Sequence, residues 1–185
     1  MANKIVRIIV GILIFCGIVV GAYFILPGSV KYPITQYLQS NFDTTNYNSV
    51  VNAVKASTIP GNKGITYESA MNGTCDGPSW TYEKVFTDDL GNGTYNVFVD
   101  GYKTTVTFES ADSDGMITNT NAHFRVTFQV QKNGSEIKIG DKVLEAGKKA
   151  EPMKIEVANS TYLPTDDNDY FQKALDFFAS HGTKE

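Results

Sequence analysis

The stretch HFRVTFQV at residues 123–130 alternates polar and apolar side chains, with an apolar residue at every second position. Successive side chains of a β-strand point to opposite faces of a sheet, so this period predicts a strand with one buried face. The side chains expected to point inward are Phe124, Val126, Phe128 and Val130, with Arg125, Thr127 and Gln129 pointing outward. The stretch therefore predicts a sheet that is covered on one side.

Further strands are predicted on both sides of this stretch. Downstream, Asn133-Gly134 is typical of a two-residue turn into a strand at residues 136–139, and residues 154–157 form another short strand pattern. Upstream, a first strand is expected at residues 79–86, where the periodicity changes from near 3.6 to 2. Residues 112–120, rich in Asp, Ser, Gly and Asn, predict a loop.

The segment TYNVFVDGYKTTVTFES at residues 94–110 is interpreted as a β-hairpin. Asp100-Gly101 would supply the two left-handed turn residues that such a hairpin requires. Tyr95, Val97 and Val99 would share one face of the first strand, and the returning strand would carry Val106 and Phe108.

Three helices are predicted before these strands. Pro33 suits the first turn of one helix. Residues 44–57 form a second helix, closed by Pro60-Gly61. A third spans residues 66–71, from a Thr that is a suitable N-cap to a stop at Asn72-Gly73. Ile34, Tyr37, Leu38 and Phe42 follow helical spacing in the first helix, and Val50, Val51 and Val54 form a narrow stripe in the second.

A last helix is predicted at about residues 167–180. Its acidic entry at residues 165–167 complements the helix dipole, and Gly182 follows its end. Phe171, Ala174, Leu175 and Phe178 form a stripe wide enough to lie on a sheet. The predicted fold class is α+β: a transmembrane helix, short helices, a curved antiparallel sheet of about four to five strands, and a C-terminal helix packed on it.

Residues 8–26, IIVGILIFCGIVVGAYFIL, contain no charged residue, with Lys4 and Arg7 before them and Pro27-Gly28 after them. A helix of this length reaches about 28 Å. The hydrocarbon core of a bilayer is ~30 Å thick, so the stretch predicts a transmembrane anchor. The anchor positions are Ile8, Leu13, Phe15, Val19, Phe24 and Leu26.

The basic residues before the apolar stretch place the N-terminus in the cytoplasm and the remainder outside the cell membrane. Cleavage after Ala22 would instead secrete the protein, but the apolar run continues through Leu26 and favours a retained anchor. The expected division is residues 1–27 as cytoplasmic tip and anchor, 28–62 as a helical stalk or connector, and 63–185 as the extracytoplasmic domain.

The chain beyond residue 27 is acidic. It holds 14 Lys and Arg residues against 20 Asp and Glu residues, a formal charge of −6. A negative domain without a basic stripe argues against nucleic acid, and against an anionic membrane surface, as partners. The oligomeric state stays open.

No motif for catalysis or metal binding is recognised. The acidic loops at residues 112–114 and 166–169 lack the spacing of a calcium loop and are interpreted as a turn and a helix entry. His123, His181 and one thiol do not make a tetrahedral zinc site without carboxylates. The sequence has neither a Gly-x-Ser-x-Gly motif nor a phosphate-binding glycine loop. We therefore expect no enzyme activity, no cofactor and no metal.

Cys75 is the only cysteine outside the predicted anchor, because Cys16 lies within it. An internal disulfide is therefore not expected. Cys75 is then a buried apolar residue, an intermolecular disulfide partner or a reactive thiol, and the sequence leaves all three open.

Aromatic residues are concentrated around the predicted hairpin. On the concave face of a curved sheet they would line a pocket for a small apolar ligand or peptide. Packing of the sheet against the helices accounts for the same residues equally well. The candidate ligand- or partner-binding residues are Trp80, Tyr82, Tyr95, Phe98 and Tyr102.

Residues 54–101 resemble a loosely defined family of small exported or membrane-anchored bacterial domains. The resemblance is carried by GITYESA at residues 64–70, the lone Trp80, and VFVDG at residues 97–101, with the later strand FRVTFQV. A sheet with packed helices of this kind is similar to nuclear-transport-factor-like folds. Those folds host ligand-binding modules and extracytoplasmic scaffold subunits of secretion systems. The resemblance carries over no catalytic residue.

These observations favour a single-pass membrane protein whose extracytoplasmic domain acts by protein–protein contact, as an accessory or scaffold subunit of a bacterial envelope assembly. Anchoring raises the effective concentration of the domain, so weak contacts suffice. The alternative is an extracytoplasmic binding module for a small apolar ligand or peptide, which would use the aromatic sheet face.

Overall fold

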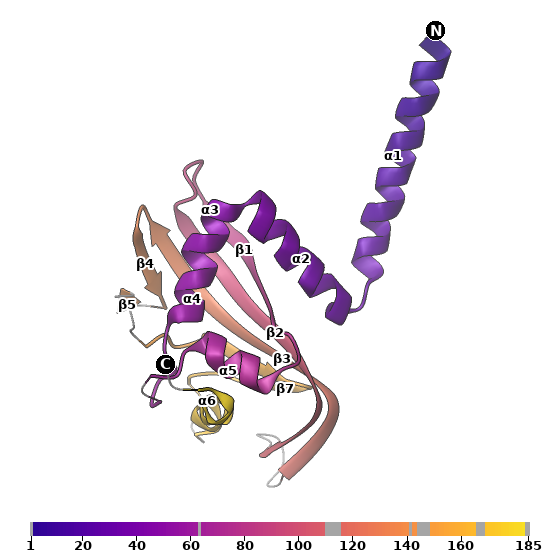
Figure 1. Cartoon of the computed structure of the whole chain (residues 1–185). Coiled ribbons are helices and arrows are strands. Elements are labelled where there is room, and N and C mark those ends of the chain that lie inside the picture. Colours follow the sequence, from indigo (N-terminus) through magenta and orange to yellow (C-terminus); the bar gives the residue numbers. More distant parts are fainter. Residues whose placement is uncertain are drawn as a thin grey trace.

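The computed structural model contains the whole chain, and describes residues 2–62, 64–109, 116–140, 142–143, 149–165 and 169–183. The helices are α1 (Ala2–Ile25), α2 (Gly28–Phe42), α3 (Thr44–Asn46), the π-helical turn η1 (Tyr47–Val51), α4 (Asn52–Ala56), α5 (Tyr67–Thr74) and α6 (Tyr170–His181). The strands are β1 (Ser79–Thr87), β2 (Gly93–Glu109), β3 (Met116–Asn133), β4 (Glu136–Ile139), β5 (Lys142–Val143), β6 (Lys154–Val157) and β7 (Ser160–Tyr162). Figure 1 shows their arrangement.

The described strands form one antiparallel sheet in which β1, β2 and β3 are consecutive neighbours. The far edge of β3 is shared, because β4 pairs with its last residues and β6 pairs with its middle. β5 continues the sheet beyond β4, and β7 continues it beyond β6. The chain is an α+β protein with an antiparallel sheet and a C-terminal helix, as the alternating patterns predict. The predicted strands at residues 136–139 and 154–157 are confirmed.

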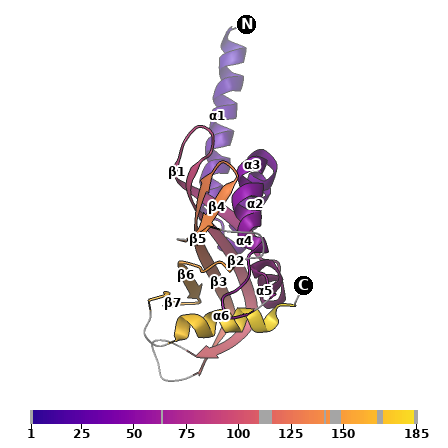
Figure 2. The same cartoon turned by 90° about the vertical axis from the view of Figure 1, so that its left-hand side faces the viewer.

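The core lies between the sheet and the helices. Figures 1 and 2 show α3, α4, α5 and α6 gathered on one face of the curved sheet. Tyr67 of α5 meets the ring of Phe128 edge-on, with centroids 4.8 Å apart, and donates a hydrogen bond of 2.7 Å to the carbonyl of Ala150. The inward set predicted for the central strand is confirmed, since Phe124, Val126, Phe128 and Val130 are all buried.

The helix predicted at residues 44–57 is present as α3, η1 and α4. Its valine stripe, Val50, Val51 and Val54, is completely buried, so this part of the predicted connector contributes to the core. The helix ends at Ala56, one residue before the predicted end at 57, because Ser57 adopts an extended backbone and its hydroxyl donates to the Val54 carbonyl.

The C-terminal helix is confirmed with a later start. α6 begins at Tyr170, after Asp169 in a left-handed conformation. Of the predicted acidic entry at residues 165–167, residues 166 and 167 lie outside the described residues. Phe171, Leu175 and Phe178 of its apolar stripe are buried, and the Phe178 ring packs on Phe124 of β3 with centroids 5.6 Å apart.

The predicted hairpin turn at Asp100-Gly101 is wrong, because β2 continues straight through both residues. Gly101 has an ordinary negative φ and pairs with Phe124 of β3. A Cβ at Gly101 would lie 2.3 Å from the Sγ of Cys75, so the glycine serves close packing. The predicted loop at residues 112–120 is also wrong from Met116 onward, where β3 has begun, and residues 112–115 lie outside the described residues.

Helix α5 also differs from its predicted end. Thr66 is the N-cap as predicted, and its hydroxyl accepts a hydrogen bond of 3.2 Å from the Ser69 amide. The helix nevertheless continues past Asn72-Gly73 to Thr74. A Cβ at Gly73 would lie 1.9 Å from the carbonyl oxygen of His181, so this glycine allows the end of α6 to cross α5 rather than ending the helix.

Helix α1 stands apart from the sheet and makes its contacts to the rest of the chain near its C-terminal end (Figure 1). Apart from the half-buried Tyr23, its large described apolar side chains are exposed, from 48% at Val10 to 84% at Ile25. Within the part of the chain that the structure describes, no helix meets the length and hydropathy required to cross a membrane.

The close crossing of α5 and α6 is tested by Gly73→Ala. In an unobstructed helix this change stabilises by up to about 1 kcal/mol. Here the added Cβ meets the His181 carbonyl, so we expect the free energy of unfolding to fall by about 1–3 kcal/mol in a urea titration. The exposed neighbour Asn72→Ala is the matched control and should change stability by less than about 0.5 kcal/mol. Stabilisation by Gly73→Ala would contradict the crossing.

Candidate functional site

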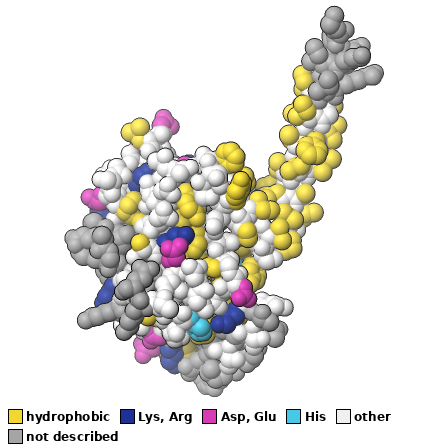
Figure 3. Space-filling view, viewed as in Figure 1, with side chains coloured by type: hydrophobic (Ala, Val, Ile, Leu, Met, Phe, Trp, Pro, Cys, Tyr) yellow, Lys and Arg dark blue, Asp and Glu magenta, His cyan; other side chains and the backbone are white. Residues whose placement is uncertain are grey.

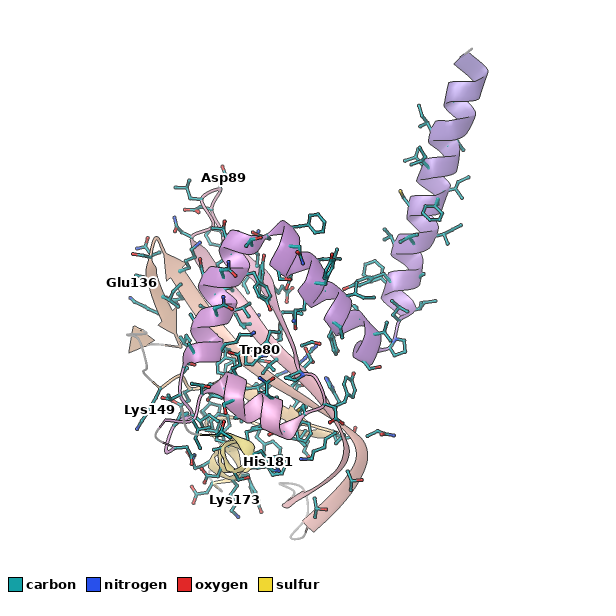
Figure 4. The ribbon with its side chains drawn as sticks, viewed as in Figure 1. Trp80, Asp89, Glu136, Lys149, Lys173 and His181 are labelled. Carbon is teal, nitrogen blue, oxygen red and sulfur yellow. The ribbon has the colours of Figure 1, made fainter. Side chains whose placement is uncertain are left out.

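The five predicted aromatic binding residues do not share a surface. Trp80, Tyr82 and Tyr95 point toward the helices and are buried, and Figure 4 places Trp80 between the sheet and the helices. Phe98 and Tyr102 occupy the alternate positions of β2, so they lie on the opposite face and are half-buried. A single aromatic pocket made by all five residues is therefore not formed.

Helix α2 covers the outer edge of β1 through two glutamine side chains. Gln39 donates to the Tyr82 carbonyl at 2.7 Å and accepts from the Tyr82 amide at 3.0 Å, as a neighbouring strand would. Gln36 accepts from the Trp80 amide at 2.6 Å. An edge strand carries unpaired backbone donors and acceptors, and these two side chains satisfy three of them. The polar side of α2 is thus turned toward the domain.

The apolar side of α2 consequently faces outward. Pro33 also lies inside the helix rather than in its first turn, because the Pro27 carbonyl accepts from the Val30 amide at 3.0 Å and so begins the helix earlier. The apolar stripe of α2 faces away from the domain because the edge of β1 requires hydrogen-bonding groups, which apolar side chains lack. Its exposed members range from 38% to 82%: Ile34, Tyr37, Leu38 and Phe42, with Val30 beside them.

A charged cluster lies on the sheet face that the helices leave open. The Asp100 carboxylate has no exposed surface. It accepts hydrogen bonds from Arg125 Nε at 2.7 Å, Arg125 Nη2 at 3.1 Å and His123 Nε2 at 2.8 Å. Asp100 and Arg125 are direct partners in the β2–β3 register. Burial lowers the pKa of Arg125, but the hydrogen bond and charge of Asp100 outweigh it and hold that pKa above its usual value.

Aromatic rings enclose this cluster from two elements. The Arg125 guanidinium lies 4.9 Å from the centre of the Tyr32 ring and 5.1 Å from that of Phe98. The His123 ring stacks on Tyr32 at 5.7 Å and on Tyr102 at 4.8 Å. Burial, the largest cause, raises the pKa of Tyr32 although Arg125 opposes it. Because Tyr32 belongs to α2, the cluster joins the start of that helix to the open sheet face.

Sequence reasoning placed Arg125 on the outward side of its strand but did not identify the cluster. The available signal was an Asp and an Arg on neighbouring strands. That signal is useful only when the pairing of β2 with β3 is known. A turn at Asp100-Gly101 would have ended the strand there, so the pairing of Asp100 with Arg125 was not predicted. Nothing in the sequence indicates that Tyr32 belongs to the cluster, because its contacts depend on how α2 packs against the sheet.

A second polar network lies at the other end of α2. Asp43 accepts from Lys84 Nζ at 2.8 Å and from the Tyr82 hydroxyl, and Asn46 donates to it at 2.9 Å. Burial alone would raise the pKa of Asp43, but these hydrogen bonds hold it below its usual value. The network borders a surface hollow of about 430 Å³ lined by Leu38, Gln39, Phe42, Asp43, Tyr82 and Lys84. The hollow is lined by apolar side chains of α2 and by the Asp43–Lys84 ion pair, whose two members already bind each other.

No group of three or more His, Cys, Asp or Glu side chains among the described residues is arranged to hold a metal ion. His123 is committed to Asp100, and His181 packs on the Phe177 ring at the end of α6. The acidic residues Asp112, Asp114, Asp166 and Asp167 lie outside the described residues.

Cys75 is buried against Gly101 at the end of α5. Burial, the largest cause, raises the pKa of its thiol to about 12. Of the three roles that the sequence leaves open, this environment fits a small buried residue, because the thiolate is the reactive form and is disfavoured here.

Comparisons with protein-family models, with curated proteins and with solved structures find no match to this chain. The resemblance to nuclear-transport-factor-like folds therefore stays a prediction, and function has to be argued from the surfaces themselves.

The buried ion pair is tested by Arg125→Met, which keeps the aliphatic stem and removes both hydrogen bonds to Asp100. The carboxylate is then left buried with His123 alone, and we expect a loss of about 3 kcal/mol in unfolding free energy. Lys138→Met is the control, because its amine lies 3.5 Å from Glu136 in an exposed pair worth less than about 1 kcal/mol. Adding Asp100→Asn to Arg125→Met should recover part of the loss. Equal effects of the two Met variants would contradict the buried pair.

The environment of Cys75 is tested by thiol alkylation in a Cys16→Ser chain. We expect iodoacetamide to modify Cys75 far more slowly in the folded protein than in urea. Because burial raises the pKa of Cys75 from 9.0 to about 12, the folded thiol stays protonated between these pH values, where the unfolded thiol ionises. The folded state therefore binds more protons in that interval, so the Cys75 contribution to stability falls as pH rises through it. Equal rates in both states would show that the thiol is accessible.

Proposed function

We propose that this chain is a single-pass membrane-anchored protein whose α+β domain lies outside the cytoplasm and acts through protein–protein contacts, as an accessory or scaffold subunit of a bacterial envelope assembly. The observation that carries the proposal is the surface of α1. Its apolar side chains are exposed on every side, with Leu13 at 65% and Phe15 at 66%. A helix that is apolar all round requires a surrounding apolar medium.

The length of the apolar stretch supports the same assignment. The uncharged apolar stretch of the sequence runs from residue 8 to residue 26. At 1.5 Å per residue this stretch reaches about 28 Å. That length matches a bilayer core of ~30 Å without requiring a large tilt.

The distribution of charge supports the orientation. Lys4 and Arg7 precede the stretch, while the chain beyond residue 27 carries a formal charge of −6. Basic residues are retained on the cytoplasmic side of a membrane. The acidic domain would therefore lie outside, joined to the anchor through Leu26 and Pro27.

The open sheet face is the surface that we propose for a protein partner. Figure 2 shows it on the side away from α3, α4 and α5. Its half-buried side chains include Phe98, Tyr102 and Arg125 around the Asp100 carboxylate. Aromatic and arginine side chains are enriched at the energetically important positions of protein interfaces. The Asp100 pair holds Arg125 in place before a partner arrives, which lowers the entropy lost on binding.

The ligand-binding alternative receives less support. Three of its five aromatic residues, Trp80, Tyr82 and Tyr95, are used in the core. Phe98 and Tyr102 remain on a sheet face, whereas small-ligand sites are concave and bury most of the ligand surface. We therefore favour the protein-contact function.

One experiment on the full chain tests both parts of the proposal. A photo-crosslinking residue, benzoylphenylalanine, replaces Tyr102 on the open face or, as a control, Lys173 on the exposed side of α6 (Figure 4). In native membranes we expect discrete adducts from the Tyr102 position and none from Lys173. The protein should also remain in the membrane fraction after an alkaline carbonate wash.

The variant Val19→Arg should weaken both results. A charge at the middle of a membrane helix costs about 2.5–3.5 kcal/mol of insertion free energy, so we expect the chain to enter the carbonate-soluble fraction and the adducts to decrease. Thr161→Arg, an exposed position in β7, is the matched control. Carbonate-soluble wild-type protein would contradict the anchor. Equal adducts from Tyr102 and Lys173, or none from either, would contradict the interface.

A further inference from the structure

Helix α2 is amphipathic in the reverse sense to a helix packed on a protein core. Gln36 and Gln39 face the domain and bind the edge of β1, whereas Leu38 and Phe42 face outward at 45% and 82% exposure. We call the outward set the α2 stripe: Val30, Ile34, Tyr37, Leu38 and Phe42. Apolar side chains arranged in a continuous exposed row mark a surface that something else covers.

The short connection between α1 and α2 restricts what can contact the α2 stripe. α1 ends at Ile25 and α2 begins at Gly28, so two residues separate the helices. The Tyr23 hydroxyl is hydrogen-bonded to Thr35 across the elbow. The Lys31 amine lies 5.3 Å from the centre of the Tyr23 ring and 5.7 Å from that of Phe24. The start of the α2 stripe is therefore held against the end of the apolar helix.

We propose that the α2 stripe inserts into the interfacial layer of the same bilayer that α1 spans, on the extracytoplasmic side. This inference rests on the proposed anchor. It makes α2 a second membrane contact, one that holds the sheet domain close to the lipid surface in a defined orientation and leaves the open sheet face available to a partner.

The composition of α2 fits lipid as the occupant. Lys31 is the only charged residue among its 15 residues, and the helix contains no carboxylate. Tyr37 combines an apolar ring with a hydroxyl, and such residues concentrate at the membrane–water interface. Asp43, just past the helix end, is already paired with Lys84. Figure 3 shows apolar side chains running down α1 and continuing onto the adjoining part of the domain.

The acidic charge of the domain bears on how α2 would bind. A formal charge of −6 beyond residue 27 opposes attraction to an anionic membrane, so binding has to come from apolar insertion next to the anchor. A zwitterionic bilayer is therefore the appropriate test surface.

The test places a nitrobenzoxadiazole fluorophore on single cysteines of the full chain, in a Cys16→Ser, Cys75→Ala background, inserted into phosphatidylcholine vesicles. The labelled variants are Leu38→Cys and Phe42→Cys in the α2 stripe, Val19→Cys in the anchor, and Asn159→Cys on an exposed turn of the domain as the matched control. Lipid carrying a quencher near its headgroup and iodide in the water report where each fluorophore lies. Each chain is used only if its urea midpoint equals that of the unlabelled background.

We expect the Leu38 and Phe42 labels to be blue-shifted and quenched from the lipid, as the Val19 label is, while the Asn159 label is quenched by iodide alone. If the Val19 label is quenched from the lipid but the α2 labels are quenched by iodide, the anchor stands and this inference is overturned. If the α2 labels are protected from both quenchers, a protein or a second copy covers the stripe, which also overturns it. If the Val19 label itself is reached by iodide, the anchor fails.

Discussion

The exposed edge of β1 is the constraint on which the arrangement of this protein depends. A strand at the border of a sheet presents backbone amides and carbonyls that have to be satisfied, and natural proteins cover or blunt such edges. Here two glutamines of α2 take over the role of a missing strand, and Gln39 reproduces the paired donor and acceptor of a strand neighbour. This requirement rotates α2 so that its polar side faces the protein. Its apolar side is left outside, directly after the apolar helix α1.

The same orientation of α2 also brings its first turns against the open face of the sheet. With Gln36 and Gln39 on the edge of β1, Tyr32 lies one turn earlier on the same side of α2 and reaches the Arg125 guanidinium on the open sheet face. The Asp100–Arg125 pair is thus covered by a residue of α2, the helix that follows α1. Tyr32 therefore places the start of α2 next to the open sheet face.

Long strands carry the cluster into place. β2 pairs with β3 from Gly93 to Glu109, and the register sets Asp100 opposite Arg125. At Gly101 this ladder passes close to Cys75, because a Cβ at that position would lie 2.3 Å from the Cys75 sulfur. The packing partner of this glycine lies far away in sequence, at the C-terminal end of α5.

What the sequence determined by itself is the part of the structure that follows from local periodicity. The alternation in HFRVTFQV, the valine stripe of residues 44–57, the Thr66 N-cap and the stripe of α6 are recovered because each reports which side of one element is apolar. The fold class follows from them. Tertiary structure alone decided the direction of the α2 stripe, the role of Gly101 and Gly73, and the Asp100–Arg125 cluster. Each of these depends on a contact between distant segments: a backbone edge that needs hydrogen bonds, a sulfur, a carbonyl or a facing strand. Residue patterns along one segment carry no information about such partners.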